Sequence, residues 1–179
     1  ETAGAAFTTG TPYRGMVQSL VRLRSNDEFI LTILNAEPDN PIATLVEKCE
    51  TPNVMVRAIG GSRKLYNLAT ILRLPLAPPV ACEADLYFTS DLEYLGRLDA
   101  PQVAHIADLS SVRQPKRSTM NALGRSLRRA QLAKLATTST HLTTVSDFTR
   151  QDLYNWDSRF KDRVTVSYNG IDDIWFQRP

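Results

Sequence analysis

The chain has 179 residues, of which 42% are hydrophobic and 22% are charged, and its formal net charge is +2. These values are typical of a soluble globular domain that buries its own core, and the charge is too small to indicate nucleic-acid binding. No apolar stretch reaches the roughly 20 residues of a membrane-spanning helix, and the first residues lack the order of a secretory signal, so a cytoplasmic domain is expected. Cys49 and Cys82 lie far apart without metal-like spacing, which argues against a disulfide framework or a zinc site and predicts two reduced core residues.

Segments with helix-like and strand-like patterns mostly alternate along the chain. Apolar residues have helical spacing over 16–23, 65–72 and 123–135, and apolar runs of strand length cover 29–34, 54–59, 86–89, 103–107, 142–145 and 164–167. Continuous apolar strands joined by helices long enough for crossovers are typical of a parallel sheet covered on both faces. We therefore predict an α/β domain over residues 1–167, with a Rossmann-like, doubly wound, mainly parallel sheet, followed by a linker over 168–179.

In open α/β sheets, ligands bind beyond the carboxyl ends of the strands. The residues that follow the predicted strands are small and polar, and the candidates among them are Gly60, Gly61, Asp108, Ser110, Ser146, Asn169 and Gly170. Gly60 and Gly61 precede a predicted helix, where they either present backbone N–H groups to a phosphate or form a plain turn. Gly10, Thr11 and Arg14 lead into the first predicted helix, where they either approach a ligand or form a turn with one solvated arginine.

Ser146, His105 and Asp108 have structural as well as functional interpretations. Ser146 opens a predicted helix, so it is expected to be an N-cap that also lines the cleft. His105 and Ala107 share one strand face because side chains alternate with period two, and Asp108 falls at the strand end. A lone strand histidine is usually a packed core residue, and Asp108 is either a loop anchor or a catalytic carboxylate. No Ser-His-Asp order, metal-binding histidine pair or spaced Asp-x-Asp stands out, so no metal site is predicted.

Three segments occur in an order that resembles a known enzyme family. They are Val-Ala-His-Ile-Ala-Asp-Leu-Ser (103–110), Thr-Val-Ser-Asp-Phe-Thr-Arg-Gln-Asp-Leu (144–153) and Val-Thr-Val-Ser-Tyr-Asn-Gly-Ile-Asp (164–172). Together they resemble the family-four glycosyltransferases of GT-B fold, and residues 10–23 are similar to the glycine loop and first helix of that family. The resemblance covers residues 85–179 by motif and residues 10–74 by pattern alone.

The resemblance implies a transferase that moves a sugar from a nucleotide-sugar donor to a glycan or lipid-linked acceptor, as in cell-surface polysaccharide or lipopolysaccharide biosynthesis. It implies that this chain is the N-terminal, acceptor-side half, and that the C-terminal, donor-binding half lies outside it. The reaction implied is metal-independent and needs no cofactor, because positive charge and helix N-termini stabilise the departing diphosphate. Asp108 matches the family's aspartate, Ser146 its cleft-edge serine, and Asn169 and Gly170 its linker turn.

The sequence departs from the family at Ala107, where the family carries a histidine before Asp-Leu. The nearest histidine is His105, about 7 Å further from the strand end at a rise of ~3.3 Å per residue. The candidate catalytic residues are therefore Asp108 and His105, with Asp108 needed as a base if the reaction inverts the anomeric centre and dispensable if it retains it. The alternative hypothesis is a binding module of the same fold that has lost catalysis.

The segment between Arg113 and Lys134 is basic, and no acidic residue occurs between Asp108 and Asp147. It predicts either a solvated helix face or a peripheral contact at the inner face of the cell membrane, because each clustered Lys or Arg adds about 1 kcal/mol of attraction to an anionic surface. Nucleic-acid binding is not expected, since no aromatic residue is interleaved with these charges.

Overall fold

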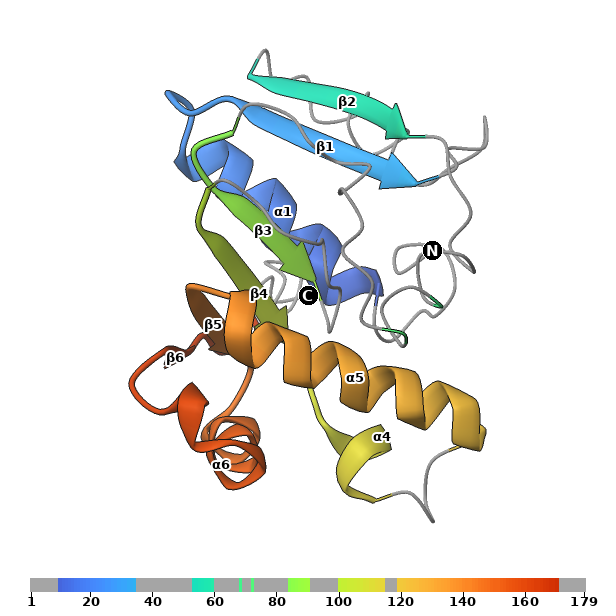
Figure 1. Ribbon diagram of the computed structural model, residues 1–179. Coiled ribbons are helices and arrows are strands. Elements are labelled where there is room, and N and C mark those ends of the chain that lie inside the picture. Colours follow the sequence, from blue (N-terminus) through green and yellow to red (C-terminus); the bar gives the residue numbers. More distant parts are fainter. Residues whose placement is uncertain are drawn as a thin grey trace, which may run out of the picture. The chain divides into compact units, whose positions relative to one another are not determined.

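The computed structural model describes residues 10–34, 53–59, 68, 72, 84–90, 100–114 and 119–170 (Figure 1). This part of the chain is mixed α/β, and all of its paired strands are parallel. The chain divides into two compact units, one made of Glu1–Gly61 with Asn169–Pro179 and the other of Ser62–Tyr168. The single domain over 1–167 stays a prediction.

The first unit contains helix α1 (Gly10–Leu23) and a two-stranded parallel sheet of β1 (Phe29–Leu34) and β2 (Val54–Ile59). The two strands are in full register, because every residue of β1 has a partner in β2. Both strands have the bounds that the apolar runs predict, so these two predictions are confirmed.

Helix α1 begins earlier than the sequence pattern predicts. Gly10, Thr11 and Arg14 lie inside this helix rather than in a turn that leads into it, so the predicted helix start is wrong, while a ligand contact of these residues stays a prediction. Pro12 is compatible with this position, since the first helical turn has N–H groups without an intrahelical partner and a missing one costs little.

The second unit contains a four-stranded parallel sheet in the order β3-β4-β5-β6. Its strands are β3 (Tyr87–Ser90), β4 (Gln102–Ile106), β5 (His141–Thr144) and β6 (Val164–Val166), and its helices are α4 (Ser110–Arg113), α5 (Ala122–Thr138), α6 (Asp147–Trp156) and the 3-10 helix η1 (Ser158–Phe160). The predicted strands are confirmed to within one residue at each end, and the helix predicted over 123–135 is α5. The described residues do not include Cys49, Cys82, Gly60, Gly61 or most of the helix predicted over 65–72.

The core of the second unit lies between one face of the four-stranded sheet and its helices. Ala104 and Ile106 of β4 share this face with the buried residues Leu142 of β5 and Val164 of β6, as the strand register requires. They cluster with side chains of the helical layer, namely Leu132, Leu135 and Ala136 of α5, Leu153 of α6 and Phe160 of η1. Helices α5 and α6 therefore cover the same face, because right-handed crossovers between strands that follow chain order all pass over one side. Among the helices that the structure describes, none is long and apolar enough to cross a membrane.

The C-terminal end of α5 is held by Arg163, a residue that lies more than twenty positions further along the chain. The Arg163 guanidinium donates to the carbonyl oxygens of Ala136 and Ser139, both at 2.8 Å, and to that of Arg159 at 2.6 Å. The last carbonyls of a helix have no intrahelical partner, and a cation at this end also interacts favourably with the helix dipole. Arg163 thus joins the end of α5 to the turn that precedes β6.

We expect Arg163→Ala to lower the free energy of unfolding by about 2 kcal/mol, because three carbonyl groups lose a charge-assisted donor. Arg163→Lys should recover only part of this loss, since a compact ammonium cannot reach all three carbonyls as the planar guanidinium does. Urea denaturation followed by circular dichroism measures the change, with Lys161→Ala as the exposed control. Equal unfolding midpoints for Arg163→Ala and the control would contradict the role of Arg163.

Candidate functional site

The carboxyl ends of β4, β5 and β6 lie level with one another at one edge of the sheet. Their last residues, Ile106, Thr144 and Val166, are partners in the strand register. The residues that follow, which are Asp108, Ser110, Ser146, Ser167 and Tyr168, therefore leave the sheet along the same edge. The segment after β6 stays attached to its neighbour, since the Ser167 N–H donates to the Thr144 carbonyl oxygen at 2.7 Å.

Asp108 is an exposed carboxylate at the end of β4. Its Oδ1 atom accepts hydrogen bonds from the Ser110 N–H at 2.7 Å and from the Ser110 hydroxyl at 2.5 Å. This arrangement anchors the turn into α4, as one of the two predicted interpretations requires. Within the described part of the chain, Oδ2 of this exposed carboxylate has no hydrogen-bond partner.

Ser146 is the N-cap of α6, as the sequence predicts. Its half-buried hydroxyl accepts from the Thr149 N–H at 3.2 Å, which satisfies one of the free donors at the helix start. The buried Thr149 hydroxyl lies 3.2 Å from the Ser146 hydroxyl and donates to the Ala107 carbonyl oxygen at 3.1 Å. These bonds hold the N-terminus of α6 against the end of β4, and they place Ser146 beside the segment that carries Asp108.

The His105 imidazole lies inside the sheet and not at its edge. Only 4% of the residue is exposed, and its Nδ1 atom is 2.8 Å from the Thr143 hydroxyl on the neighbouring strand. The ring stacks on Phe88 with 6.4 Å between centroids. His105 belongs to the face opposite the core cluster, because Ala104 and Ile106 occupy the helix-covered face. Burial lowers the pKa of His105 from its ordinary value of 6.5, so the neutral form is favoured.

The depressed pKa of His105 predicts a pH-dependent stability. The imidazole of His105 takes up a proton near pH 6.5 in the unfolded chain and only at a lower pH in the folded chain. The contribution of neutral His105 to the free energy of unfolding is therefore complete above pH 6.5 and is lost as the pH falls through the folded pKa. We expect the wild type to lose stability more steeply below that pH than His105→Gln, which has no titrating group there. Urea denaturation at several pH values below 6.5 gives the slope of the free energy of unfolding against pH for each protein. His141 is present in both proteins, so it does not contribute to the difference between them. Equal slopes would contradict a buried neutral His105.

A second polar pair at this edge is formed by Asp147 and Tyr168, and Tyr168 was not among the predicted site residues. The Tyr168 hydroxyl donates to Oδ2 of Asp147 at 3.1 Å, and Oδ1 of Asp147 is 2.5 Å from Nη2 of Arg150. The hydrogen bond to Asp147 raises the pKa of Tyr168. Tyr168 is 70% exposed, and Phe148, which follows Asp147 in α6, is 74% exposed. Only the positions of the two residues could have indicated this pair in the sequence. Asp147 begins α6 directly after its cap, and Tyr168 follows the last residue of β6 by two positions.

The other described site predictions fall in the first compact unit. Asn169 and Gly170 are exposed and belong to this unit. A Cβ atom added at Gly170 would meet nothing within 4 Å, so no crowding requires glycine there. Gly10, Thr11 and Arg14 also lie in that unit, in the first turns of α1.

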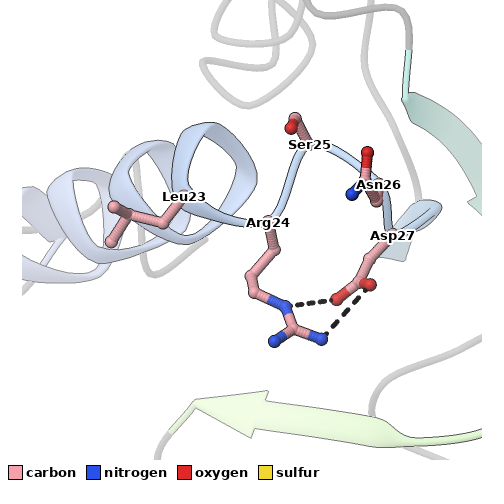
Figure 2. Close-up of a pocket in the computed structure, with 5 residues that line it drawn as sticks. All are labelled: Leu23, Arg24, Ser25, Asn26 and Asp27. Atoms are coloured by element: carbon pink, nitrogen blue, oxygen red, sulfur yellow. Dashed lines mark hydrogen bonds and ion pairs between the residues drawn. The ribbon is translucent and has the colours of Figure 1, made fainter.

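An open hollow of about 230 Å³ lies in the first unit, between the end of α1 and the start of β1. Figure 2 shows its lining, the consecutive residues Leu23, Arg24, Ser25, Asn26 and Asp27. Arg24 and Asp27 form an ion pair with 2.7 Å between Nε and Oδ2, which raises the pKa of Arg24. The Asn53 amide donates to the Asp27 carbonyl oxygen at 2.9 Å, which ties this turn to the start of β2. The hollow is thus the surface of a turn that is held by the ion pair of Arg24 with Asp27 and by the hydrogen bond from Asn53. None of the residues that line it is a predicted site residue.

No protein-family model, no curated protein and no solved structure gives a significant match to this chain. In the ranges that the structure describes, no group of three or more His, Cys, Asp or Glu residues could hold a metal ion. The described edge therefore offers an exposed carboxylate, several hydroxyl groups, a helix N-terminus and exposed aromatic side chains.

Proposed function

We propose that this chain is the acceptor-side half of a GT-B glycosyltransferase, which transfers a sugar from a nucleotide-sugar donor to a glycan or lipid-linked acceptor. In this proposal the parallel sheet belongs to a Rossmann-like, doubly wound domain. The consecutive order of β3 to β6, with α5 and α6 on one face, is what one half of a doubly wound sheet contains. The donor-binding half would follow the linker that begins near Asn169 and Gly170.

One observation carries the proposal: the three sequence motifs that suggest the family supply one level edge of the sheet. Asp108 belongs to the first motif, Ser146 to the second and Tyr168 to the third. The register of β4, β5 and β6 brings their ends level, and the bond from Thr149 to the Ala107 carbonyl joins the first two segments. Ligand sites of open α/β sheets occur at this edge, which supports a substrate site there.

The chemistry open to this edge is acceptor binding and proton transfer. In an inverting reaction, Oδ2 of Asp108 would accept the proton of the attacking acceptor hydroxyl while Oδ1 keeps its bonds to Ser110. The hydroxyl of Tyr168 and the carboxylate of Asp147 are polar groups suited to sugar hydroxyls. The bond from the anomeric carbon to the diphosphate breaks as the acceptor oxygen attacks, and the diphosphate leaves toward the donor-binding half.

A binding module without catalysis is the second candidate, and His105 and Ala107 favour it. The histidine of the first motif, His105, lies two residues before Ala107, is buried in the sheet and is hydrogen-bonded to Thr143. Ala107, which stands at the family's histidine position, has no group that transfers a proton. A module of this kind would bind an acceptor glycan and turn over no donor.

A screen for turnover by the complete encoded polypeptide separates the two candidates, and Asp108→Asn tests whether Asp108 is the base of an inverting reaction. Asparagine keeps an oxygen for the Ser110 bonds but cannot take a proton, so we expect kcat/KM for sugar transfer to fall at least about 100-fold with little change in unfolding midpoint. Asp85→Asn is the matched control, because Asp85 is an exposed aspartate that precedes β3 at the opposite end of the strand. A screen of nucleotide-sugar donors supplies the assay. Absence of any turnover with any donor would overturn the enzyme hypothesis, and full activity of Asp108→Asn would exclude Asp108 as the base.

The 179-residue chain alone should bind nucleotide-sugars weakly, because most donor contacts of a GT-B enzyme come from the other half of the molecule. We expect titration calorimetry to give dissociation constants on the order of 1 mM or higher, which means a binding free energy no more favourable than about −4 kcal/mol. The complete polypeptide is the positive control. Micromolar donor binding by the chain alone would contradict its assignment as the acceptor side.

A further inference from the structure

Asn169 is the one asparagine in the sequence that glycine follows. It comes directly after Tyr168, the last residue of the second compact unit, in the irregular segment that continues from β6. Asn169 and Gly170 are both exposed. No hydrogen bond of the Asn169 side chain or of the Gly170 N–H occurs among the described residues. Neither the side-chain amide nor the backbone nitrogen that follows it is therefore held by secondary structure.

The residue after an asparagine decides how closely its backbone nitrogen approaches the carbonyl carbon of the asparagine side chain. A side chain at that position obstructs the approach, whereas glycine has none. A Cβ atom added at Gly170 would meet nothing within 4 Å, and the backbone of Gly170 is not in the left-handed region. Alanine therefore fits at this position without a clash or backbone strain, so the effect of glycine on Asn169 can be tested by substitution.

We propose that Asn169 is a site of spontaneous deamidation. The Gly170 nitrogen loses its proton to a solvent base and attacks Cγ of Asn169. The new C–N bond closes a cyclic succinimide, and the side-chain nitrogen of Asn169 takes up a proton and leaves as ammonia. One water molecule then opens the ring. Hydrolysis at the side-chain carbonyl gives aspartate, and hydrolysis at the backbone carbonyl gives isoaspartate, so the chain gains one negative charge in either case.

The structure describes four other asparagines, which are Asn26, Asn53, Asn121 and Asn155. The side-chain amides of Asn53 and Asn121 make hydrogen bonds at 2.9 and 2.8 Å. Asn155 lies inside α6, where the helix holds the backbone. Asn26 is exposed, but the residue that follows it is an aspartate, whose side chain obstructs ring closure. Among the described asparagines, Asn169 therefore has the best access to the succinimide.

Deamidation changes both charge and backbone at a defined place in the chain. The hydroxyl of Tyr168 donates to Oδ2 of Asp147, so the residue before Asn169 is anchored to α6. Aspartate at position 169 places a new carboxylate directly after this anchor. Isoaspartate also adds a methylene group to the backbone there, because the chain then passes through the former side chain. The protein is therefore expected to acquire an acidic form as it ages.

Incubation of the whole chain at neutral and at mildly alkaline pH tests the proposal. It needs no transferase activity, so its outcome is independent of the proposed function. Ion-exchange chromatography measures the acidic form, and mass spectrometry of the tryptic peptide that begins at Val164 locates the change. We expect deamidation at Asn169, with a higher rate at the higher pH because the attacking nitrogen must lose its proton. Gly170→Ala should slow the reaction at least about ten-fold, which corresponds to an activation barrier higher by about 1.4 kcal/mol.

Two controls keep the test specific. Gly15→Ala makes the same substitution at a glycine where an added Cβ atom also meets nothing within 4 Å, and it should leave the rate at Asn169 unchanged. A synthetic peptide that spans Asn169 and Gly170 gives the rate in the absence of the fold, and circular dichroism checks that each variant is folded. Equal rates in the wild type and Gly170→Ala, or a rate in the folded chain more than about ten-fold below that of the peptide, would overturn the proposal. Earlier modification at Asn26 would also overturn it.

Discussion

Parallel pairing of β4, β5 and β6 is the constraint on which the candidate site depends. Ile106, Thr144 and Val166 are partners across the sheet, and each is the last residue of its strand. Three segments separated by long stretches of chain therefore leave the sheet at the same level and on the same edge. An antiparallel arrangement of the same strands would send alternate ends to opposite edges, and Asp108 and Ser146 would be a strand length apart.

Most polar groups at this edge are used to hold the loops in place. The Thr149 hydroxyl bonds the Ala107 carbonyl, the Thr144 hydroxyl bonds the Ser146 carbonyl, and the Ser167 N–H bonds the Thr144 carbonyl. Buried polar groups without partners are costly, so this internal satisfaction stabilises the edge. What remains for a ligand is on the outside: one oxygen of Asp108, and the exposed Tyr168 with Asp147. His105 differs from these groups, because it is buried in the sheet and hydrogen-bonded to Thr143.

The elements of the second unit were predictable because their signals are local. Apolar runs placed the strands to within one residue, and the serine before a helical pattern identified the cap at Ser146. The start of α1 was predicted wrongly, since the glycine and proline near Gly10 were interpreted as a loop when the first helical turn accommodates both. Tyr168 and Asp147 are 21 residues apart, and no periodicity links them, so their hydrogen bond was not predicted.

The sequence by itself determined which segments are strands and helices, because side-chain periodicity and capping act over a few neighbouring residues. It also determined that Asp108 and Ser146 follow strands, which made them candidates. Only the tertiary structure decided that Arg163 closes the end of α5 and that His105 is buried against Thr143. These outcomes depend on packing between residues distant in the chain, and burial of a side chain is a property of its neighbours in space.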